Sequence, residues 1–244
     1  IEQKITLINP DLIINSAAYT SVENAEKEKE ICFNVNSQAP EILAKTSEKL
    51  GIPMIHYSTD YVFDGEKISC YFEDDETNPI NFYGESKLLG EKGIEKNMLK
   101  SIIIRTSWVY DNKTKNFLNS IKSKLDSDEK DIFVVNDQYG SPTWAKRIAE
   151  ITFILVNIIN KKPIWGKYHF SSNGYTSWYN YAKLIAKIYK PEKINCIKPM
   201  SSKNLKQLAR RPKNSELSNN KINKIFTFSQ ENWSNDVELC VKGL

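Results

Sequence analysis

The sequence predicts a doubly wound, parallel α/β sheet with a second, smaller mixed α/β region. Short apolar runs alternate with longer helical patterns along most of the 244 residues. This alternation is typical of a parallel sheet with helices on both faces. The runs 53–58 and 101–106 are apolar almost throughout, as in strands buried on both faces. A hydrophobic content of 40% is enough to build the core of such a fold.

Proline, glycine and capping residues indicate where the predicted elements begin and end. An opening helical stretch ends at Asn9–Pro10, and Ser21 is a plausible cap for a charged helix. The helical pattern that reaches Leu50 starts or kinks near Pro40 and stops at Gly51. The predicted strands cover residues 11–15, 53–58, 101–106, 132–135 and 166–171. Further helices are predicted over residues 79–97, 116–125, 145–160 and 177–189, with a polar, acidic surface loop over 64–78.

Two domains are predicted. Residues 1–135 carry the alternating pattern and form the main parallel sheet. Residues 136–244 form mainly a smaller mixed domain, with some segments returning to the main sheet. Past Pro191 the pattern weakens into scattered Ser, Asn and Lys with a few short apolar runs.

Composition argues against several classes of protein. The formal net charge is +4, but the basic residues are mostly lysines interleaved with acids, as in Glu26–Glu30, so nucleic-acid binding is not expected. No apolar stretch is long enough to span a membrane, and no secretory signal is present. The four cysteines form no C-x-x-C pair, which favours reduced thiols in a cytoplasmic protein without a metal site.

Polar side chains follow three of the predicted strands. The segments are Asn15–Thr20, Ser58–Tyr61 and Ser107–Tyr110. Ligands collect at the carboxyl ends of strands in such sheets. The three segments therefore predict a binding site with hydroxyls, a carboxylate and aromatic rings at one sheet edge.

Tyr83 and Lys87 lie four residues apart on the helix that follows the second of these strands, so they share a helix face. Two other pairs have this spacing, Tyr179/Lys183 and Tyr189/Lys193. Only the first pair follows a strand that ends in Ser58–Thr59. The alternative interpretation is that both residues simply lie on a solvated helix surface.

Tyr83, Lys87 and Thr59 together have the chemistry needed to protonate a carbonyl group. An ammonium about 4 Å from a phenol is worth roughly 4 kcal/mol at an effective dielectric constant of 20, enough to lower the phenol pKa by about 3 units. Tyr83 could then protonate a carbonyl oxygen while a hydride reaches the carbon. The hydroxyl of Thr59, or of Ser58, would stabilise the charge that develops on that oxygen.

Several segments together resemble the extended short-chain dehydrogenase/reductase family. They are His56–Gly65, Tyr83–Lys87, Asn15–Thr20, Arg105–Tyr110, Asn136–Thr143 and Ala209–Ser215. The resemblance covers essentially the whole chain in order, and it is closest to reductases of 4-keto sugar nucleotides. It implies a Rossmann-like sheet and reduction of the 4-keto group of dTDP-4-dehydro-L-rhamnose by NADPH or NADH. The product, dTDP-L-rhamnose, supplies cell-surface polysaccharide.

The resemblance implies that residues 1–135 are an N-terminally incomplete dinucleotide-binding domain and that residues 136–244 are mainly a substrate-binding domain. It also implies roles for individual residues. The catalytic residues would be Tyr83 as proton donor, Lys87 and Thr59. The cofactor would be bound by Ala18, Tyr19, Thr20, Tyr57, Tyr83 and Lys87. The nucleotide sugar would be bound by Thr59, Asp60, Trp108 and Arg211. A homodimer is compatible with the family, and no metal ligand is implied.

Each assignment has a simpler rival. Trp108 could be a packing residue at a strand end, Asp60 a turn residue or helix cap, and Arg210–Arg211 a solvated pair rather than a pyrophosphate clamp. His56 and His169 lie inside apolar strands, and we expect both to be core histidines rather than catalytic bases.

The Gly-rich turn that normally cradles the cofactor pyrophosphate is not found in this sequence. The nearest approach, Gly84, Gly90 and Gly93, lies inside the Tyr83 helix. If residues 11–15 correspond to about the fourth sheet strand of the family, roughly 45 family residues have no counterpart in this sequence, more than the about 30 of one βαβ unit. We favour a sequence that lacks this N-terminal part. The alternatives are a natural fragment completed by another polypeptide and a degenerate relative that binds without catalysing.

Two other functions fit the same fold. One is a non-catalytic regulatory subunit, similar to the regulatory subunit of methionine adenosyltransferase. The other is a reductase of a different 4-keto sugar nucleotide. The Tyr83, Lys87 and Thr59 set favours catalysis over the regulatory function.

We expect the 244-residue chain to bind NADPH far more weakly than a version with the Gly-rich unit restored, because that unit carries the pyrophosphate site. Fluorescence titration of both proteins measures the difference. Equal dissociation constants would contradict the expectation.

Overall fold

The computed structural model describes residues 1–159, 161–225 and 230–243. The main sheet has four strands in the order β1 (Ile13–Asn15), β2 (Met54–Thr59), β3 (Ser101–Thr106) and β8 (Gly166–His169). All neighbouring strands are parallel. The predicted parallel sheet is therefore confirmed, and β3 has the predicted bounds.

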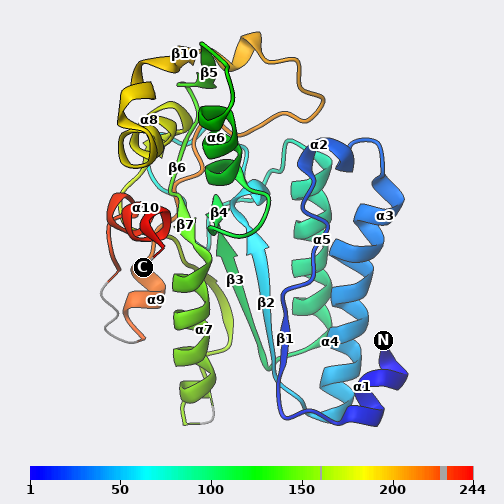
Figure 1. Ribbon diagram of the computed structural model, residues 1–244. Helices are drawn as coiled ribbons and strands as arrows, with labels where there is room; N and C mark the ends of the chain where they lie inside the picture. Colours follow the sequence, from blue (N-terminus) through cyan, green and yellow to red (C-terminus); the bar gives the residue numbers. More distant parts are fainter. Residues whose placement is uncertain (160, 226–229, 244) are drawn as a thin grey trace.

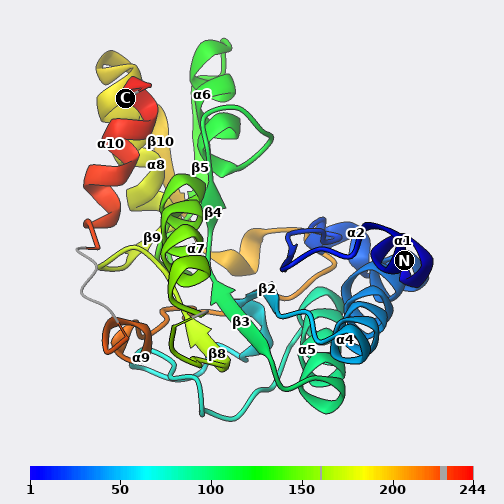
Figure 2. The same cartoon turned by 90° about the horizontal axis from the view of Figure 1, so that it is seen from below.

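Helices cover both faces of this sheet. On one face lie α1 (Glu2–Ile8), α4 (Ala39–Leu50) and α5 (Phe82–Asn97), and on the other lies α7 (Ala145–Ile159) (Figures 1 and 2). Ala44 and Ile94 pack against Met54 and Ile103 on the first face. The strand residues Ile55, Ile102 and Ile104 pack against Ile148, Ile151 and Leu155 on the second. The sheet is thus doubly wound, as predicted.

A second region packs beyond the carboxyl ends of the main strands (Figure 1). Its helices are α6 (Phe117–Asp126), α8 (Trp178–Tyr189) and α10 (Trp233–Lys242). Its short strands form three pairs: β5 (Ile132–Val135) with β10 (Ile197–Met200), β4 (Val109–Tyr110) with β7 (Thr143–Trp144), and β6 (Tyr139–Gly140) with β9 (Thr176–Ser177). Tyr110, Tyr181 and Ile185 lie in its core. β8 and α7 come after residue 135 yet pack with the main sheet, so the division at 135 stays a prediction.

The helical stretch predicted between Ser21 and Leu50 is interrupted. It consists of α2 (Val22–Ala25), α3 (Lys29–Phe33), a π-helical turn (Asn34–Gln38) and α4. Within the π turn, the buried Asn36 side chain accepts the Tyr19 N–H at 2.8 Å and donates to the Tyr19 carbonyl at 3.0 Å. The turn thereby fixes the loop that follows β1, which sequence periodicity alone does not reveal.

Other boundaries differ slightly from prediction. The predicted helix 79–97 begins at Phe82, because Asn81 caps it by accepting the Gly84 N–H. The predicted end of α7 at Asn160 lies outside the described residues. Short helical turns, at Asp60–Val62, Pro191–Cys196, Ser202–Asn204 and α9 (Asn220–Asn223), complete the elements. Within the described part of the chain, no helix is both long enough and apolar enough to cross a membrane.

Helix α5 lies very close to the end of β2. A Cβ atom on Gly84 would collide with the Tyr61 carbonyl oxygen. Glycine is therefore required at this position, directly after Tyr83. The close approach brings the first turn of α5 against the polar residues that follow β2.

A buried ion pair fastens α5 to the sheet. Arg105 on β3 donates from Nη2 to Glu91 Oε2 at 2.6 Å and from Nε to Glu91 Oε1 at 2.9 Å, and both side chains are completely buried. The Ser58 hydroxyl on β2 also donates to Glu91. One carboxylate on the helix thus joins two neighbouring strands.

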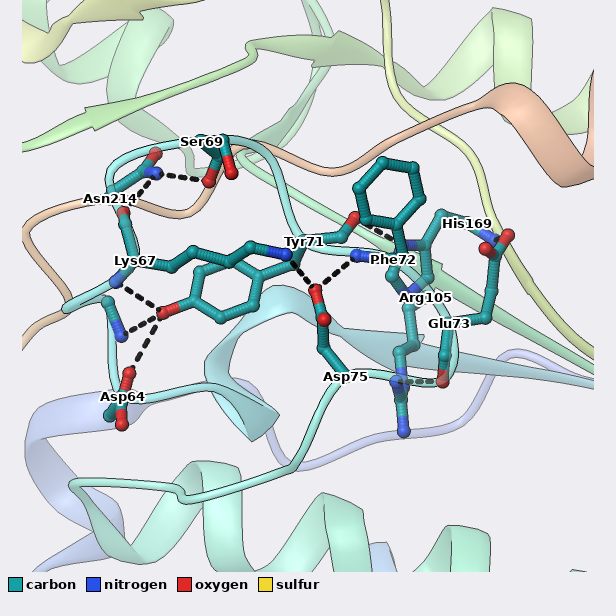
Figure 3. A network of polar contacts seen from close by, with 11 residues as sticks. Asp64, Lys67, Ser69, Tyr71, Phe72, Glu73, Asp75, Arg105, His169 and Asn214 are labelled. Carbon is teal, nitrogen blue, oxygen red and sulfur yellow. Dashed lines mark hydrogen bonds and ion pairs between the residues drawn. The ribbon is translucent and has the colours of Figure 1, made fainter.

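The predicted surface loop 64–78 is held by an ordered network (Figure 3). The Tyr71 hydroxyl donates to Asp64 at 2.8 Å and accepts the N–H groups of Gly65 and Lys67. Asn214 donates to the Lys67 carbonyl, so the late segment of the chain is tied to the loop.

The loop also reaches the sheet. Glu73 accepts the backbone N–H of His169 at 2.9 Å, and the His169 ring lies 3.2 Å from the Tyr71 carbonyl (Figure 3). The loop 64–78 is therefore a fixed support under residues 212–218 rather than a loose surface excursion.

We predict that Glu91→Gln lowers the free energy of unfolding by about 3–5 kcal/mol, because it leaves the buried Arg105 charge without its partner. Urea unfolding measures the loss. The exposed pair Lys213–Glu66 offers a matched control, where Glu66→Gln should cost less than about 1 kcal/mol. A loss below about 1 kcal/mol for Glu91→Gln would refute the assigned role of the ion pair.

Candidate active site

A cleft of about 1220 Å³ opens where β1, β2 and β3 end, between the main sheet and the second region. The carboxyl ends of parallel strands meet at one edge, as the sequence led us to expect. Of the residues predicted to form the site, those that line the cleft are Ala18, Thr20, Tyr57, Thr59, Asp60, Tyr83, Lys87, Trp108 and Arg211.

Tyr19 is placed differently from the other predicted cofactor residues. Its hydroxyl donates to Glu28 at 2.6 Å, so the ring is directed toward α3. The hydrogen bond to Glu28 and partial desolvation raise the pKa of Tyr19 to about 12. Only its backbone helps to shape the loop after β1, through the bonds with Asn36.

Tyr83 and Thr59 are brought together at the floor of the cleft. The Tyr83 phenol and the Thr59 hydroxyl both line the cleft and lie beside each other. Burial raises the pKa of Tyr83 above its ordinary value, the neighbouring Thr59 hydroxyl lowers it, and the nearby Asp60 carboxylate raises it again. At neutral pH the phenol therefore keeps its proton and can act as a donor.

Lys87 lies one turn further along α5, with 2% of its surface exposed. Its Nζ donates to the Tyr57 carbonyl at 2.6 Å and lies 3.4 Å from Nε2 of His56. Burial lowers the pKa of Lys87 to about 8, while the charge of Glu91 raises it. The amine is therefore close to losing its charge near neutral pH.

This arrangement corrects one expectation. We expected the Lys87 ammonium to lower the pKa of Tyr83 from within about 4 Å, but burial and Asp60 raise that pKa instead. The reason is that the amine turns toward the Tyr57 carbonyl on β2, where it finds a hydrogen-bond acceptor. Helical spacing correctly predicts a shared face but does not fix the direction of a long side chain.

Asp60 follows Thr59 directly and is buried. The Thr59 hydroxyl donates to Asp60 Oδ1 at 2.9 Å, whereas Oδ2 finds no hydrogen-bond partner within the described residues. Burial raises the pKa of Asp60 to about 7, against the lowering effect of its hydrogen bonds. A buried carboxylate oxygen without a partner, in a cleft, is well placed to accept a ligand hydroxyl.

Aromatic rings form the wall of the cleft in the second region. Trp108 stacks on Trp178 with ring centroids 3.5 Å apart and an interplanar angle of 7°. The Trp108 backbone has a φ of 46°, which is strained for a bulky residue, and strain of this kind concentrates at functional sites. Gly140 leaves the space that the Trp108 indole occupies, since a Cβ there would lie 2.5 Å from the ring.

Arg211 reaches the cleft mouth from the late segment of the chain. Its Nη2 lies 3.3 Å from Oε1 of Glu23, and its buried Nε has no hydrogen-bond partner among the described residues. Arg210 is exposed, but its backbone carbonyl accepts from Asn81 at 2.8 Å, next to the start of α5. Of the two adjacent arginines, the structure thus directs Arg211 toward the cleft.

Sequence reasoning missed two groups at this site, Trp178 and Glu23, which line the cleft. Asn15, the first residue of the predicted segment Asn15–Thr20, contacts His56 below the cleft. Trp178 and Glu23 give no local signal, because their roles come from contacts with Trp108 and Arg211, which are distant in sequence.

Known proteins are similar to this chain in sequence and in fold. A family model described as the RmlD substrate binding domain matches residues 1–244. The chain is 37% identical over 249 residues to dTDP-4-dehydrorhamnose reductase from Escherichia coli K12, and the match covers all of this chain and 83% of that protein.

Solved structures agree with this match. The chain superimposes with a TM-score of 0.90 on dTDP-4-dehydrorhamnose reductase from Bacillus anthracis in complex with NADP, at 33% identity, covering 100% of this chain and 84% of that one. An orthologous reductase from Clostridium acetobutylicum gives the same TM-score at 29% identity, covering 99% and 83% of the two chains.

We predict that Asp60→Asn stabilises the protein at pH 8 but not at pH 4. The folded pKa of Asp60, about 7, lies above the unfolded value of about 3.9, so the folded state holds the proton more tightly and loses stability as the pH rises from about 4 to 7. The shift of about 3 units corresponds to as much as about 4 kcal/mol. An asparagine side chain cannot ionise and avoids this loss.

Urea unfolding at pH 4 and pH 8 tests the prediction. The exposed Asp128 serves as a control, since Asp128→Asn should change stability little at either pH. If Asp60→Asn has the same effect at both pH values, Asp60 does not titrate as described.

Proposed function

The chain belongs to the RmlD substrate binding domain family, and we propose that it reduces the 4-keto group of dTDP-4-dehydro-L-rhamnose with NADPH or NADH, yielding dTDP-L-rhamnose. The observation that carries the proposal is the placement of Tyr83 beside Thr59 at the end of β2, with the buried Lys87 one turn further along α5. A keto reduction needs a proton donor next to the oxygen that becomes a hydroxyl.

The residues present fit a nicotinamide cofactor at the sheet side of the cleft. Ser16 and Ala18 after β1 are small and leave their backbone accessible, and Lys87 has N–H donors beyond the one that it gives to Tyr57. Lys87, Tyr57 and the loop after β1 would hold the cofactor. When bound, the reduced nicotinamide supplies the hydride. The B. anthracis relative is described as an NADP complex, which supports this choice.

Tyr83 acts as the proton donor in this proposal. Its raised pKa keeps the phenol protonated until negative charge develops on the keto oxygen. An alkoxide is a far stronger base than a phenolate, so the proton then moves from Tyr83 Oη to the substrate oxygen. The Thr59 hydroxyl, now donating to Asp60, would turn to the same oxygen and stabilise its charge.

The remaining groups orient the nucleotide sugar. Asp60 Oδ2, which has no partner within the described chain, accepts a sugar hydroxyl. The Trp108–Trp178 stack offers a flat apolar surface to a sugar or base. Arg211 exchanges its contact with Glu23 for the pyrophosphate, whose oxygens match a guanidinium better than a single carboxylate oxygen at 3.3 Å does.

Two expectations about the protein as a whole stay predictions. We expect a cytoplasmic location and a homodimer, from the family resemblance and the reduced cysteines. Cell fractionation checks the first, and light scattering coupled to gel filtration checks the second.

We predict that Tyr83→Phe lowers kcat by a factor of about 10²–10⁴, the usual contribution of a positioned proton donor. NADPH oxidation with dTDP-4-dehydro-L-rhamnose, followed by absorbance, measures the loss. NADPH binding, read by fluorescence titration, should survive because Phe preserves the packing of α5.

Tyr179→Phe is the matched control. Tyr179 belongs to the other helical Tyr/Lys pair, with Lys183, but packs against the core of the second region away from the cleft. Its substitution should leave kcat unchanged. Turnover of Tyr83→Phe within about threefold of the wild type would show that Tyr83 is not the donor.

A further inference from the structure

His56 lies on β2 beneath the cleft and is completely buried between Asn15 and Lys87. Its Nδ1 is 3.0 Å from Asn15 Nδ2, and its Nε2 is 3.4 Å from Lys87 Nζ. The proposed proton transfer does not use the imidazole. A fully buried imidazole that contacts the amine of the active site nevertheless influences that amine.

The backbone fixes which nitrogen of His56 carries the hydrogen. The Ala17 N–H donates to Asn15 Oδ1 at 3.2 Å, so the Asn15 amide turns its NH₂ group toward the imidazole. An NH₂ group can only donate, which makes His56 Nδ1 the acceptor. Burial and the charge of Lys87 hold the pKa of His56 well below its usual range, so the ring is neutral. Its single hydrogen is therefore on Nε2.

The Nε2–H group of His56 then points at Lys87. An ammonium has no lone pair with which to accept this hydrogen, whereas a neutral amine has one. The Tyr57 carbonyl accepts from the Lys87 amine in either state. Two other groups lie near Lys87. The Glu91 carboxylate, on the same helix, favours the charged form. Burial raises the pKa of the Cys32 thiol on α3, so Cys32 adds no charge near neutral pH.

We infer that His56 is a positioning residue for Lys87, whose Nε2–H donates to the neutral amine and so restricts the pH range in which Lys87 is charged. A series of hydrogen bonds of defined direction connects the loop after β1 to α5. It runs from Ala17 through Asn15 and His56 to Lys87. The effect on catalysis rests on the proposed function, whereas the hydrogen-bond directions do not.

The tautomer can be measured without substrate. The chain contains two histidines, and the structure assigns them opposite tautomers. His169 Nδ1 lies 3.2 Å from the Tyr71 carbonyl, which only accepts, so His169 carries its hydrogen on Nδ1. Nitrogen-15 NMR of histidine-labelled protein should show one ring of each kind, and His169→Gln assigns the remaining Nε2–H ring to His56. An Nδ1–H ring at His56 would overturn the inference.

The Asn15→Asp substitution reverses the direction of the hydrogen bond between residue 15 and His56. A carboxylate can only accept, so it would accept from Ala17 and from His56 Nδ1–H, and the lone pair of Nε2 would face Lys87. NMR should then show His56 as the Nδ1–H tautomer. The charged form of Lys87 should persist to a pH at least about one unit higher, a roughly tenfold change in its dissociation constant.

The titration of Lys87 is read from the carbon-13 shifts of lysine-labelled protein, assigned with Lys87→Arg, and from the alkaline limb of kcat/KM. Because the Asn15→Asp substitution also adds a negative charge, His56→Gln is measured in parallel. It adds no charge, and its amide oxygen can accept from the ammonium, so it should move the titration in the same direction.

An unmoved Lys87 titration in folded His56→Gln protein would refute the role of His56. Absence of reductase activity in the wild-type protein would instead refute the proposed function. The two failures are distinguishable, since neither NMR measurement requires substrate.

Discussion

The ion pair between Arg105 and Glu91 determines how α5 lies on the sheet, and the geometry of the site depends on that placement. Arg105 comes from β3, and the Ser58 hydroxyl on β2 binds the same carboxylate. Glu91 lies one turn beyond Lys87, so fixing it fixes the distance between the amine and the end of β2. Charges this deeply buried are tolerated only when they are paired and hydrogen-bonded, which leaves α5 little freedom to slide.

Burial shifts the three ionisable groups of the site toward their neutral forms. It raises the pKa of Asp60 and of Tyr83 and lowers the pKa of Lys87. Near neutral pH Asp60, with a pKa of about 7, is only partly ionised, and Tyr83 keeps its proton, so the floor of the cleft carries little negative charge. A dinucleotide and a sugar nucleotide are themselves strongly anionic, so a floor with little negative charge of its own avoids repelling them.

Much of this could be read from the sequence, and the limits are physical. The strand 101–106 was predictable because its apolar run is bounded by polar residues, and the meeting of Thr59 with Tyr83 follows from strand-end position combined with helical spacing. The direction of the Lys87 amine was not predictable, because the Tyr57 carbonyl that attracts it belongs to another element. The stacking of Trp108 on Trp178 likewise depends on tertiary packing alone.

The late segment of the chain connects parts that are far apart in sequence. Pro212 packs closely against Gly65. The backbone carbonyl of Arg210 accepts a hydrogen bond from the Asn81 side chain, and the backbone N–H of Leu208 donates one to Glu23. The residues proposed to recognise the substrate and those proposed to transform it are therefore connected by one stretch of polypeptide. Recombining such proteins to change their specificity would require the exchange of several non-contiguous segments at once. A single crossover before residue 208 would place this stretch against a loop and a helix start that come from another protein.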